Sequence, residues 1–351
     1  MADHNLRFSA SSLAEQGSFK LMELPPELCQ LMEASLLSEG DGSSLKIKGK
    51  PGEDAVLCTK DKTYAIRAVS LSNSILVVTS PPDSELNEIL ELTQTIPKLH
   101  KLNALLKGKE YGEDEEDNDD SMNIDVQDFT YADAQAMIQA SEAELSRGLR
   151  ERRILQINES LRPISSAYLT KIIQFILNSL AALSLNHESV PIEKLCTALA
   201  DEHDVPRTVS AQVMGWFGDI NELEGRWTLN VDAVVREAGL GILKESKDKS
   251  VDKDELIISW KELGNYLSSK DHYSEDETVK YFPVSSLPAD PAQRFSDLFL
   301  TRSKWKNEDI IPFLSDIAVN AKERDKMLLK YARATTDAQG IWYTARAQYN
   351  G

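Results

Sequence analysis

The stretch at residues 54–79 constrains the fold of this chain most, because polar turns divide it into short apolar or alternating segments. Val, Ile and Thr are frequent in these segments, and that composition is typical of β-strands. An alternating segment just upstream adds a fourth, so the expected strands are 45–48, 55–59, 63–69 and 74–79. Four successive strands predict an antiparallel meander. Because about eight strands are needed before side chains fill a barrel, this sheet should stay open.

An open sheet leaves unpaired backbone groups along its edges, and proteins normally cover such edges. We therefore predict an N-terminal antiparallel β half-barrel that is completed by partner chains. Its strands carry the side chains that we expect to be buried or to face the partner. These predicted partner-binding residues are Tyr64, Ile66, Ile75 and Val77.

Helices are expected on both sides of the meander. Pro25 and Pro26 can open a helix that runs to residue 37, since proline is tolerated in the first turn of a helix. After the meander, Leu86, Ile89, Leu90 and Thr93 recur at helical spacing and predict a second helix. A short helix or strand at 98–106 would end the first domain.

The run EDEEDNDD at residues 113–120 interrupts the chain abruptly. Like charges repel one another and the run has no apolar residue, so it should stay extended and solvated. It is either a linker or an acidic segment that binds a basic partner or competes with DNA for the chain's own basic face. The main domain boundary is placed here.

Beyond the acidic run, the order helix, turn, helix, hairpin recurs, which is the arrangement of winged-helix domains. Ser141 should cap a helix in the first round, with Glu144 completing a capping box, and Asn307 should cap a helix in the last round. The expected helices are 131–139, 141–153, 166–183, 192–202, 207–217, 231–244, 254–263, 290–299, 308–319 and 322–333, and the hairpin strands lie within 154–164, 223–229, 279–284 and 341–345. Counting hairpins allows three or four units.

Several stretches resemble the Dcc family of sister-chromatid-cohesion proteins: LMELPPEL at 21–28, LKIKG at 45–49, DAVLCTKDKTYAIRAVSLSNSILVV at 54–78 and, further on, FPVSSLPADPAQRFSDLFLTRSKWKNEDIIPFL at 282–314. The resemblance implies a subunit of the alternative, cohesion-specific RFC-like clamp loader. Its half-barrel would assemble with the large AAA+ and the small subunits of that complex. It would also imply three winged helices, contacts to leading-strand DNA polymerase epsilon, an indirect link to the sliding clamp PCNA, and a nuclear location.

A locally basic part of the chain is the best candidate for DNA contact. Residues 289–351 carry ten Lys/Arg and eight Asp/Glu, whereas the whole chain has a net charge of −18, and phosphates are bound by cations. Four of these cations recur at i, i+4, i+8 and i+11 of the last predicted helix, where a winged helix has its recognition helix. The predicted DNA-binding residues are Lys322, Arg324, Lys326, Lys330, Arg333, Arg346 and Trp342. The alternative is a solvated helix face, and an aromatic residue in a wing is more often part of the core.

A second basic face lies in the first winged helix, where Arg147, Arg150 and Arg153 are predicted to bind a partner. Arginine is favoured at protein interfaces as well as on phosphates. Since this helix follows the acidic run directly, we interpret the face as a protein-docking surface, and the resemblance implies the polymerase as the partner.

No residue pattern predicts catalysis. The chain has no GxxxxGK[ST] phosphate loop, so it should not hydrolyse nucleotides. His203, between Glu202 and Asp204, is either a metal or acid–base group or a solvated helix end. We expect no enzyme activity and no cofactor. The three widely spaced cysteines favour a reducing nuclear or cytosolic location, and no apolar run is long enough for a membrane span.

The sequence thus predicts an α+β chain divided into 1–110 for subunit assembly, 111–125 as an acidic linker, 126–230 and 231–288 as winged-helix regions, and 289–351 as the C-terminal winged helix. The expected function is that of a non-catalytic adaptor that contacts single- and double-stranded DNA without sequence preference. The alternative is a transcription regulator that reads a preferred DNA site through base-edge contacts.

Overall fold

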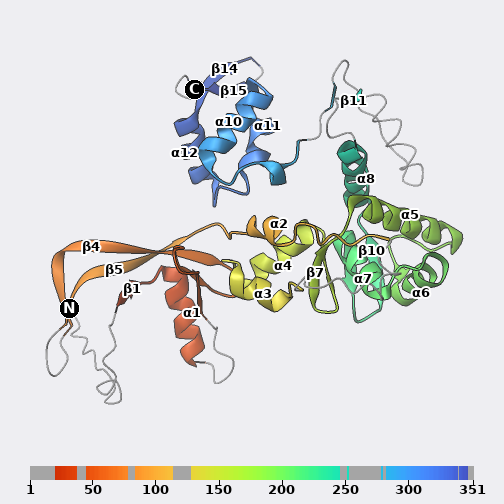
Figure 1. Ribbon diagram of the computed structural model, residues 1–351, viewed down its shortest axis with the longest axis horizontal. Helices are drawn as coiled ribbons and strands as arrows, with labels where there is room; N and C mark the ends of the chain where they lie inside the picture. The colour runs from red at the N-terminus through yellow and green to blue at the C-terminus, as the bar shows by residue number, and fades with distance from the viewer. Residues whose placement is uncertain are drawn as a thin grey trace. The chain divides into compact units, whose positions relative to one another are not determined.

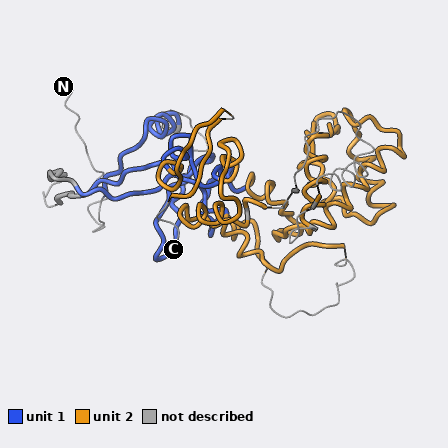
Figure 2. Tube along the Cα trace, turned by 90° about the horizontal axis from the view of Figure 1, so that it is seen from above, with its two compact units in different colours: residues 1–99, 135–145, 314–326 blue, residues 100–134, 146–313, 327–351 orange. Residues whose placement is uncertain are grey.

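The computed structural model describes residues 20–37, 45–77, 84–113, 128–245, 251–252, 278–279, 282–338 and 340–346. The fold is mixed α+β (Figure 1). The chain forms two compact units, and each is assembled from segments that are distant in sequence (Figure 2). The first unit comprises Met1–Leu99, Gln135–Leu145 and Leu314–Lys326, and the second comprises His100–Ala134, Ser146–Phe313 and Met327–Gly351. The division into five predicted segments stays a prediction.

The N-terminal part is a curled five-stranded sheet that forms a half-barrel. Its strands are β1 (Leu21–Glu23), β2 (Lys46–Lys48), β3 (Val56–Cys58), β4 (Thr63–Val77) and β5 (Ser84–Gln94), in the order β1-β5-β4-β3-β2. The strands β2 to β5 form an antiparallel meander, although its fourth strand is β5 and not the predicted segment 74–79, and β1 joins it parallel to β5. The predicted half-barrel is therefore confirmed, while its completion by partner chains stays a prediction.

Two predicted elements of this sheet are wrong. The segments 63–69 and 74–79 were expected as separate strands, but β4 runs through both as far as Val77, with a register shift between Ser70 and Ile75. The helix expected over Leu86–Thr93 is strand β5. The apolar residues at helical spacing there also fit a strand, and the long ladder that β5 forms with β4 decides between the two.

Helix α1 (Pro26–Leu37) follows β1 and begins at Pro26, as expected. Leu28 of this helix is 1% exposed and forms a buried cluster with Leu57, Tyr64 and Leu92 of the sheet. Leu57 and Tyr64 are direct cross-strand neighbours, so α1 covers the face of the sheet on which both lie.

The segment after the sheet follows the predicted order of elements: α2 (Lys101–Leu105), α3 (Tyr131–Met137), α4 (Glu142–Glu151), β6 (Ile154–Ile157) and β7 (Ser160–Pro163). The predicted capping box is confirmed. The amide of Glu144 donates to Ser141 Oγ at 3.2 Å, and the amide of Ser141 donates to Glu144 Oε2 at 3.0 Å.

The largest core among the described residues surrounds α5 (Ser166–Ala182), whose apolar side chains such as Leu169, Ile172 and Ile176 are buried. The elements around it are β8 (Val190–Pro191), α6 (Ile192–His203), α7 (Arg207–Trp216), β9 (Gly218–Asn221), β10 (Arg226–Leu229) and α8 (Val231–Glu245). Trp227 of β10 is fully buried and donates from Nε1 to the carbonyl of Met214 at 2.9 Å. A short pair, β11 (Val251–Asp252) and β12 (Thr278–Val279), follows, and the helix predicted at 254–263 lies outside the described residues.

The C-terminal elements are the 3₁₀ helix η3 (Val284–Ser286), α10 (Pro291–Thr301), β13 (Lys304–Lys306), α11 (Asn307–Ile310), the 3₁₀ helix η4 (Ile311–Leu314), α12 (Ala321–Tyr331), β14 (Ala332–Asp337) and β15 (Gly340–Ala345). Of the strand predicted at 279–284, Val279 belongs to β12 and Val284 begins η3, while residues 280–281 lie outside the described residues. The predicted hairpin at 337–345 is found, and β13 completes a three-stranded sheet.

Two further predictions for this region are wrong. Asn307 does not cap a helix over 308–319, because Lys306 occupies the cap position and α11 ends at Ile310. Pro312 explains the short helix, since proline has no amide proton to donate and clashes with the preceding turn. Arg333 does not lie on the last helix. Helix α12 ends at Tyr331, and the next residues pair with β15 as strand β14.

Candidate interaction surfaces

The segment Gln135–Leu145 follows the acidic run in sequence but is hydrogen-bonded to the N-terminal sheet. Thr63 is fully buried, and its hydroxyl donates to Glu144 Oε2 at 2.6 Å while accepting from the amide of Ser141 at 2.9 Å. Gln139 Nε2 donates to the carbonyl of Asp54 at 2.6 Å. The sheet therefore has a second, polar layer that comes from its own chain, and no sequence pattern predicted it.

Lys48 and Cys58 belong to this polar layer. Lys48 Nζ donates to the carbonyl of Ala140 at 2.7 Å, and burial lowers the pKa of this ammonium group below its ordinary value. Burial likewise raises the pKa of the Cys58 thiol, so Cys58 stays protonated and unreactive near neutral pH. Lys48 thus links β2 to the segment Gln135–Leu145.

The predicted partner-binding residues of the sheet are placed in different environments. Tyr64 is 2% exposed and belongs to the chain's own core, and Ile66 packs partly buried against the same cluster. Both side chains thus follow the buried alternative of the expectation, and their contact with a partner stays a prediction. Ile75 and Val77 lie on β4, but their side chains are outside the described residues.

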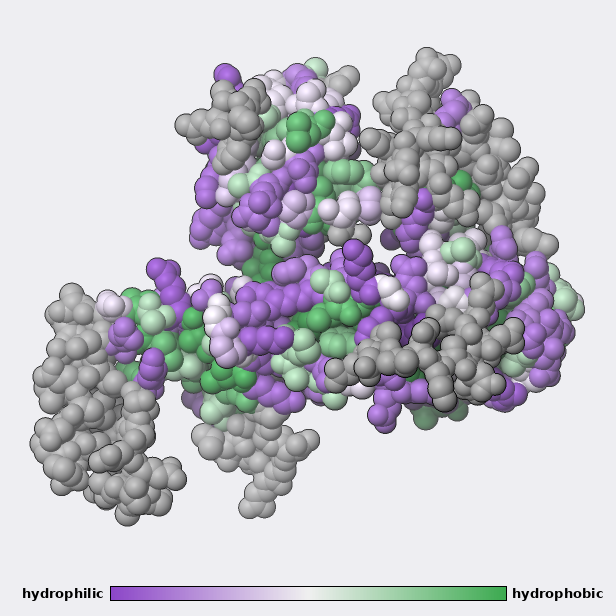
Figure 3. Space-filling model, in the orientation of Figure 1, coloured by the Kyte–Doolittle hydropathy of each residue, from purple (hydrophilic) through white to green (hydrophobic). Residues whose placement is uncertain are grey.

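Exposed apolar residues instead mark the two edges of the sheet. Ile47 on the edge strand β2 is 65% exposed, and Leu21 on the edge strand β1 is 42% exposed. Figure 3 also shows hydrophobic surface over the described part of β4 and β5. Sequence reasoning missed both residues, although Ile47 lies in the LKIKG motif.

The predicted arginine face of α4 is only partly a surface. Arg147 and Arg150 are exposed, and Arg147 lies 4.0 Å from Glu151, which lies one helical turn further on. Arg153 is instead held inside the chain: its Nη2 lies 2.8 Å from Glu237 Oε2 of α8. The guanidinium group also lies 4.6 Å from the ring centroid of Phe217. Arg153 is therefore tied into the chain's own packing, and its role as a partner-binding group stays a prediction.

The hairpin β6–β7 begins directly after Arg153 and is hydrogen-bonded to α7. The amide of Gln156 donates to Gln212 Oε1 at 2.9 Å, and Gln212 Nε2 donates back to the carbonyl of Gln156 at 2.9 Å. Arg153 has a φ of 54°, a left-handed conformation in which a side chain is strained. These long-range contacts carry no sequence signal, because neither glutamine nor arginine at these positions belongs to a local pattern.

Both ends of the acidic run are attached to strand β7 and the residues that follow it. Before the run, the amide of Tyr111 donates to the carbonyl of Pro163 at 2.7 Å. After the run, the carbonyl of Phe129 accepts from the amide of Leu161 at 2.8 Å. The chain thus leaves β7 and returns to it.

The predicted DNA-binding residues lie on α12 and on the C-terminal hairpin. Lys322, Lys326 and Lys330 are exposed on α12, as helical spacing requires, and Arg324 pairs with Asp325 at 3.1 Å. Arg333 is exposed on β14. Of the four cations predicted to lie on the last helix, Lys322, Lys326 and Lys330 are found there and Arg333 is not.

The wing residues Arg346 and Trp342 are tied into the same region. Arg346 Nη1 donates to the carbonyl of Lys330 at 3.4 Å. Trp342 is half-buried, and its Nε1 donates to Asp337 Oδ1 at 2.9 Å. The ammonium group of Lys304 lies 4.3 Å from the centroid of the Trp342 ring. Trp342 thus has partners in its own hairpin, which matches the alternative of a packing role.

The described residues contain no group of three or more His, Cys, Asp or Glu that could hold a metal ion. His203, the last residue of α6, stacks on Phe175 with ring centroids 3.9 Å apart. Within the described ranges, no helix is both long and apolar enough to cross a bilayer.

Comparison with known proteins decides the family. The family model described as Sister chromatid cohesion protein Dcc1 matches residues 19–314. The chain belongs to the Dcc1 family. The protein named Sister chromatid cohesion protein DCC1 from Homo sapiens is 29% identical, over 95% of this chain and 90% of its own length. The proteins of the same name from Xenopus laevis and Saccharomyces cerevisiae are 26% and 23% identical, over 95% and 90% of this chain and 90% and 93% of their own lengths.

The match to the Dcc1 family model includes some of the surfaces described above and not others. It includes the whole half-barrel, the polar layer at Gln135–Leu145 and the arginine network around Arg153. It ends at residue 314, before α12 and the hairpin β14–β15. The relatives from Homo sapiens and Xenopus laevis are matched over 95% of this chain, so their similarity extends beyond the family model into the C-terminal part.

Proposed function

We propose that the chain is a non-catalytic adaptor in sister chromatid cohesion. It would act as a subunit of the alternative clamp loader in the nucleus, assembling with the large AAA+ and small cohesion-specific subunits. Support comes from membership of a family named for sister chromatid cohesion and from relatives that bear the same name. The observation that carries the proposal is the open half-barrel with an exposed apolar residue on each edge strand.

The edges of the half-barrel give the adaptor its docking surface. Unpaired backbone groups on β1 and β2 can accept further strands, and Leu21 and Ile47 are exposed beside them. Ile66 and Tyr64 would then support the sheet from within, because they pack against α1 and not toward a partner. Strand addition from partner chains would close the half-barrel and bury both edges.

In the same proposal, the helical parts are tandem winged helices that direct the complex to DNA and to DNA polymerase epsilon. The exposed Lys322, Lys326 and Lys330 of α12 are suited to phosphate contacts, which carry no sequence information. On helix α7, in contrast, the Gln212 side chain exchanges two hydrogen bonds with the backbone of Gln156 in the β6–β7 hairpin. DNA contact is therefore assigned to the C-terminal helix and hairpin, and Arg147 and Arg150 of α4 to the polymerase.

The proposal is tested with full-length protein by changing the sheet edges. Leu21→Asp and Ile47→Asp replace exposed side chains, so the chain's own core should stay intact, whereas Ile66→Asp would damage that core and could not separate the two effects. Tagged variants are purified from cells, and the co-purifying large and small clamp-loader subunits are quantified. The double edge variant should lose both subunits.

Leu223→Asp is the matched control, because Leu223 is a fully exposed leucine at the turn of the β9–β10 hairpin, with an exposed fraction of 101%. This variant should retain the partner subunits. Retention of both subunits by the double edge variant, at wild-type amounts, would contradict the proposal.

A further inference from the structure

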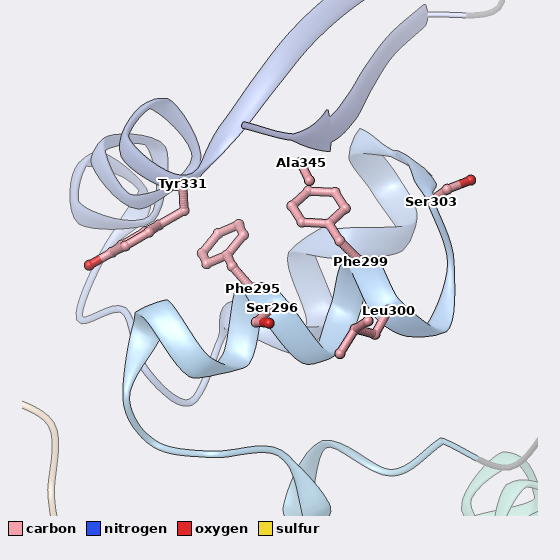
Figure 4. A pocket seen from close by; sticks show the side chains of 7 residues that line it. All are labelled: Phe295, Ser296, Phe299, Leu300, Ser303, Tyr331 and Ala345. Atoms are coloured by element: carbon pink, nitrogen blue, oxygen red, sulfur yellow. The ribbon is translucent and has the colours of Figure 1, made fainter. Parts of the chain in front are cut away.

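The C-terminal part of the chain contains a small apolar pocket (Figure 4). Its volume is ≈ 210 Å³, and the residues that line it are Phe295, Ser296, Phe299, Leu300, Ser303, Tyr331 and Ala345. The rings of Phe295 and Phe299 project from α10 toward the C-terminal strands and α12 (Figure 4). The pocket is smaller than the sites that usually hold a cofactor or a drug-sized ligand, and its size suits a single apolar side chain.

The residues beneath the pocket pack against one another. Phe295 is 2% exposed and stacks on Tyr331 with centroids 5.3 Å apart, and Leu298 is fully buried. Leu300, which also lines the pocket, is 82% exposed. An apolar side chain on the surface gains free energy only when something covers it, so Leu300 contributes little to the fold and is open to contact with a ligand.

Positive charge borders the pocket at Tyr331. The ammonium group of Lys330 lies 4.9 Å from the Tyr331 ring centroid, and the Arg346 guanidinium donates to the carbonyl of Lys330. Arg346 directly follows Ala345, which lines the pocket. None of the described residues that line the pocket is acidic. The surface is thus apolar in the centre and positive at one side, within a chain whose net charge is −18.

We propose that this pocket docks an acidic peptide segment of a partner protein through one aromatic or branched apolar side chain. The anchor would enter between Phe299, Leu300 and Tyr331, and neighbouring carboxylates of the peptide would pair with Lys330 and Arg346. A buried apolar anchor surrounded by polar contacts is the usual arrangement of energetically dominant residues at protein interfaces. This docking site is separate from the half-barrel edges and does not depend on the proposed adaptor function.

Peptide display on the full-length protein tests this proposal. A random library of peptides is selected on the wild-type chain, and the enriched sequences are synthesised with a fluorescent label. Enriched peptides should combine Asp or Glu with Phe, Trp or Leu. Leu300→Asp should weaken their binding by at least about tenfold, and Lys330→Glu should also weaken it, most at low salt, where screening is least.

The matched control is Leu329→Asp, since Leu329 on the neighbouring helix α12 is 70% exposed but does not line the pocket. This variant should bind the selected peptides as the wild type does. The proposal is overturned if no acidic peptides are enriched, or if Leu300→Asp and Leu329→Asp bind them equally well. It is also overturned if an oligothymidine single strand, and not a peptide, is the ligand whose affinity depends on Leu300.

Discussion

The hydroxyl of Thr63 should anchor Gln135–Leu145 to the half-barrel, and Thr63→Val tests this. Valine has nearly the same shape but neither donates to Glu144 nor accepts from Ser141. A hydrogen bond to a charged group contributes about 1.5–3 kcal/mol and a neutral one about 1 kcal/mol. Ser141 keeps its bond to Glu144 in the variant, so the second loss is partial. The local cost should therefore be about 2–4 kcal/mol.

Hydrogen exchange is the suitable measurement, because a chain with two compact units does not unfold in a single two-state step. About 1.4 kcal/mol corresponds to a tenfold change in an opening equilibrium, so protection of amides in β3 and in 135–145 should fall by roughly one and a half to three powers of ten. Amides of β10, in the other unit, should be unaffected.

Thr63→Ser is the control for this prediction. It keeps the hydroxyl and removes one methyl group, which should cost about 1 kcal/mol. If Thr63→Val loses no more protection than Thr63→Ser, the hydroxyl does not anchor the segment. Loss of protection throughout the chain would refute the idea of a local layer in another way, by showing general unfolding.

Two further predictions concern the second unit and the basic helix. Arg153→Ala should weaken the local structure by about 2–4 kcal/mol because it leaves the nearly buried Glu237 without its cation. Arg153→Gly should cost about 1 kcal/mol less, since glycine tolerates the φ of 54°. Hydrogen exchange of amides in α8 and β6 would show the order, and a reversed order would refute the strain. The double variant Lys326→Glu/Lys330→Glu should weaken binding to all duplex sequences alike and reduce the salt slope by about one unit for each phosphate that the helix no longer neutralises. Fluorescence anisotropy at several salt concentrations measures the DNA affinity. The control is the double variant Lys50→Glu/Lys60→Glu, which changes the charge equally at two other exposed lysines. Equal affinities of the two double variants would exclude a phosphate-contacting role for Lys326 and Lys330.

The sequence predicted elements whose signal is local. The capping box at Ser141 and Glu144 and the C-terminal hairpin both rest on residues within a few positions of one another, and both are found. Strand β5 was missed because its leucines satisfy helical spacing and strand alternation at once, and only the ladder with β4 distinguishes them. Arg333 was assigned to a helix because its charge continues the stripe, although pairing with β15 begins one residue earlier.

The candidate surfaces were harder to predict for the same reason. Lys322, Lys326 and Lys330 are exposed on one helix, so spacing alone identified them. Arg153 looked like their equivalent in the first helical region, but Glu237 lies 84 positions away in the sequence and no pattern connects the two. Similarly, the edge residues Leu21 and Ile47 became apparent only once the strand order was known.

Both flanks of the acidic run are attached near strand β7. The length of the run therefore has a different consequence from the length of a linker. A segment that joins two bodies acts as a spacer, and its length sets how far apart they can move. A segment that leaves β7 at Pro163 and returns to it at Leu161 is a closed loop. Closing a loop of twice the length costs only about 0.6 kcal/mol more. Insertions or deletions in the acidic run should thus be tolerated over long evolutionary times without altering the spacing of anything else in the chain.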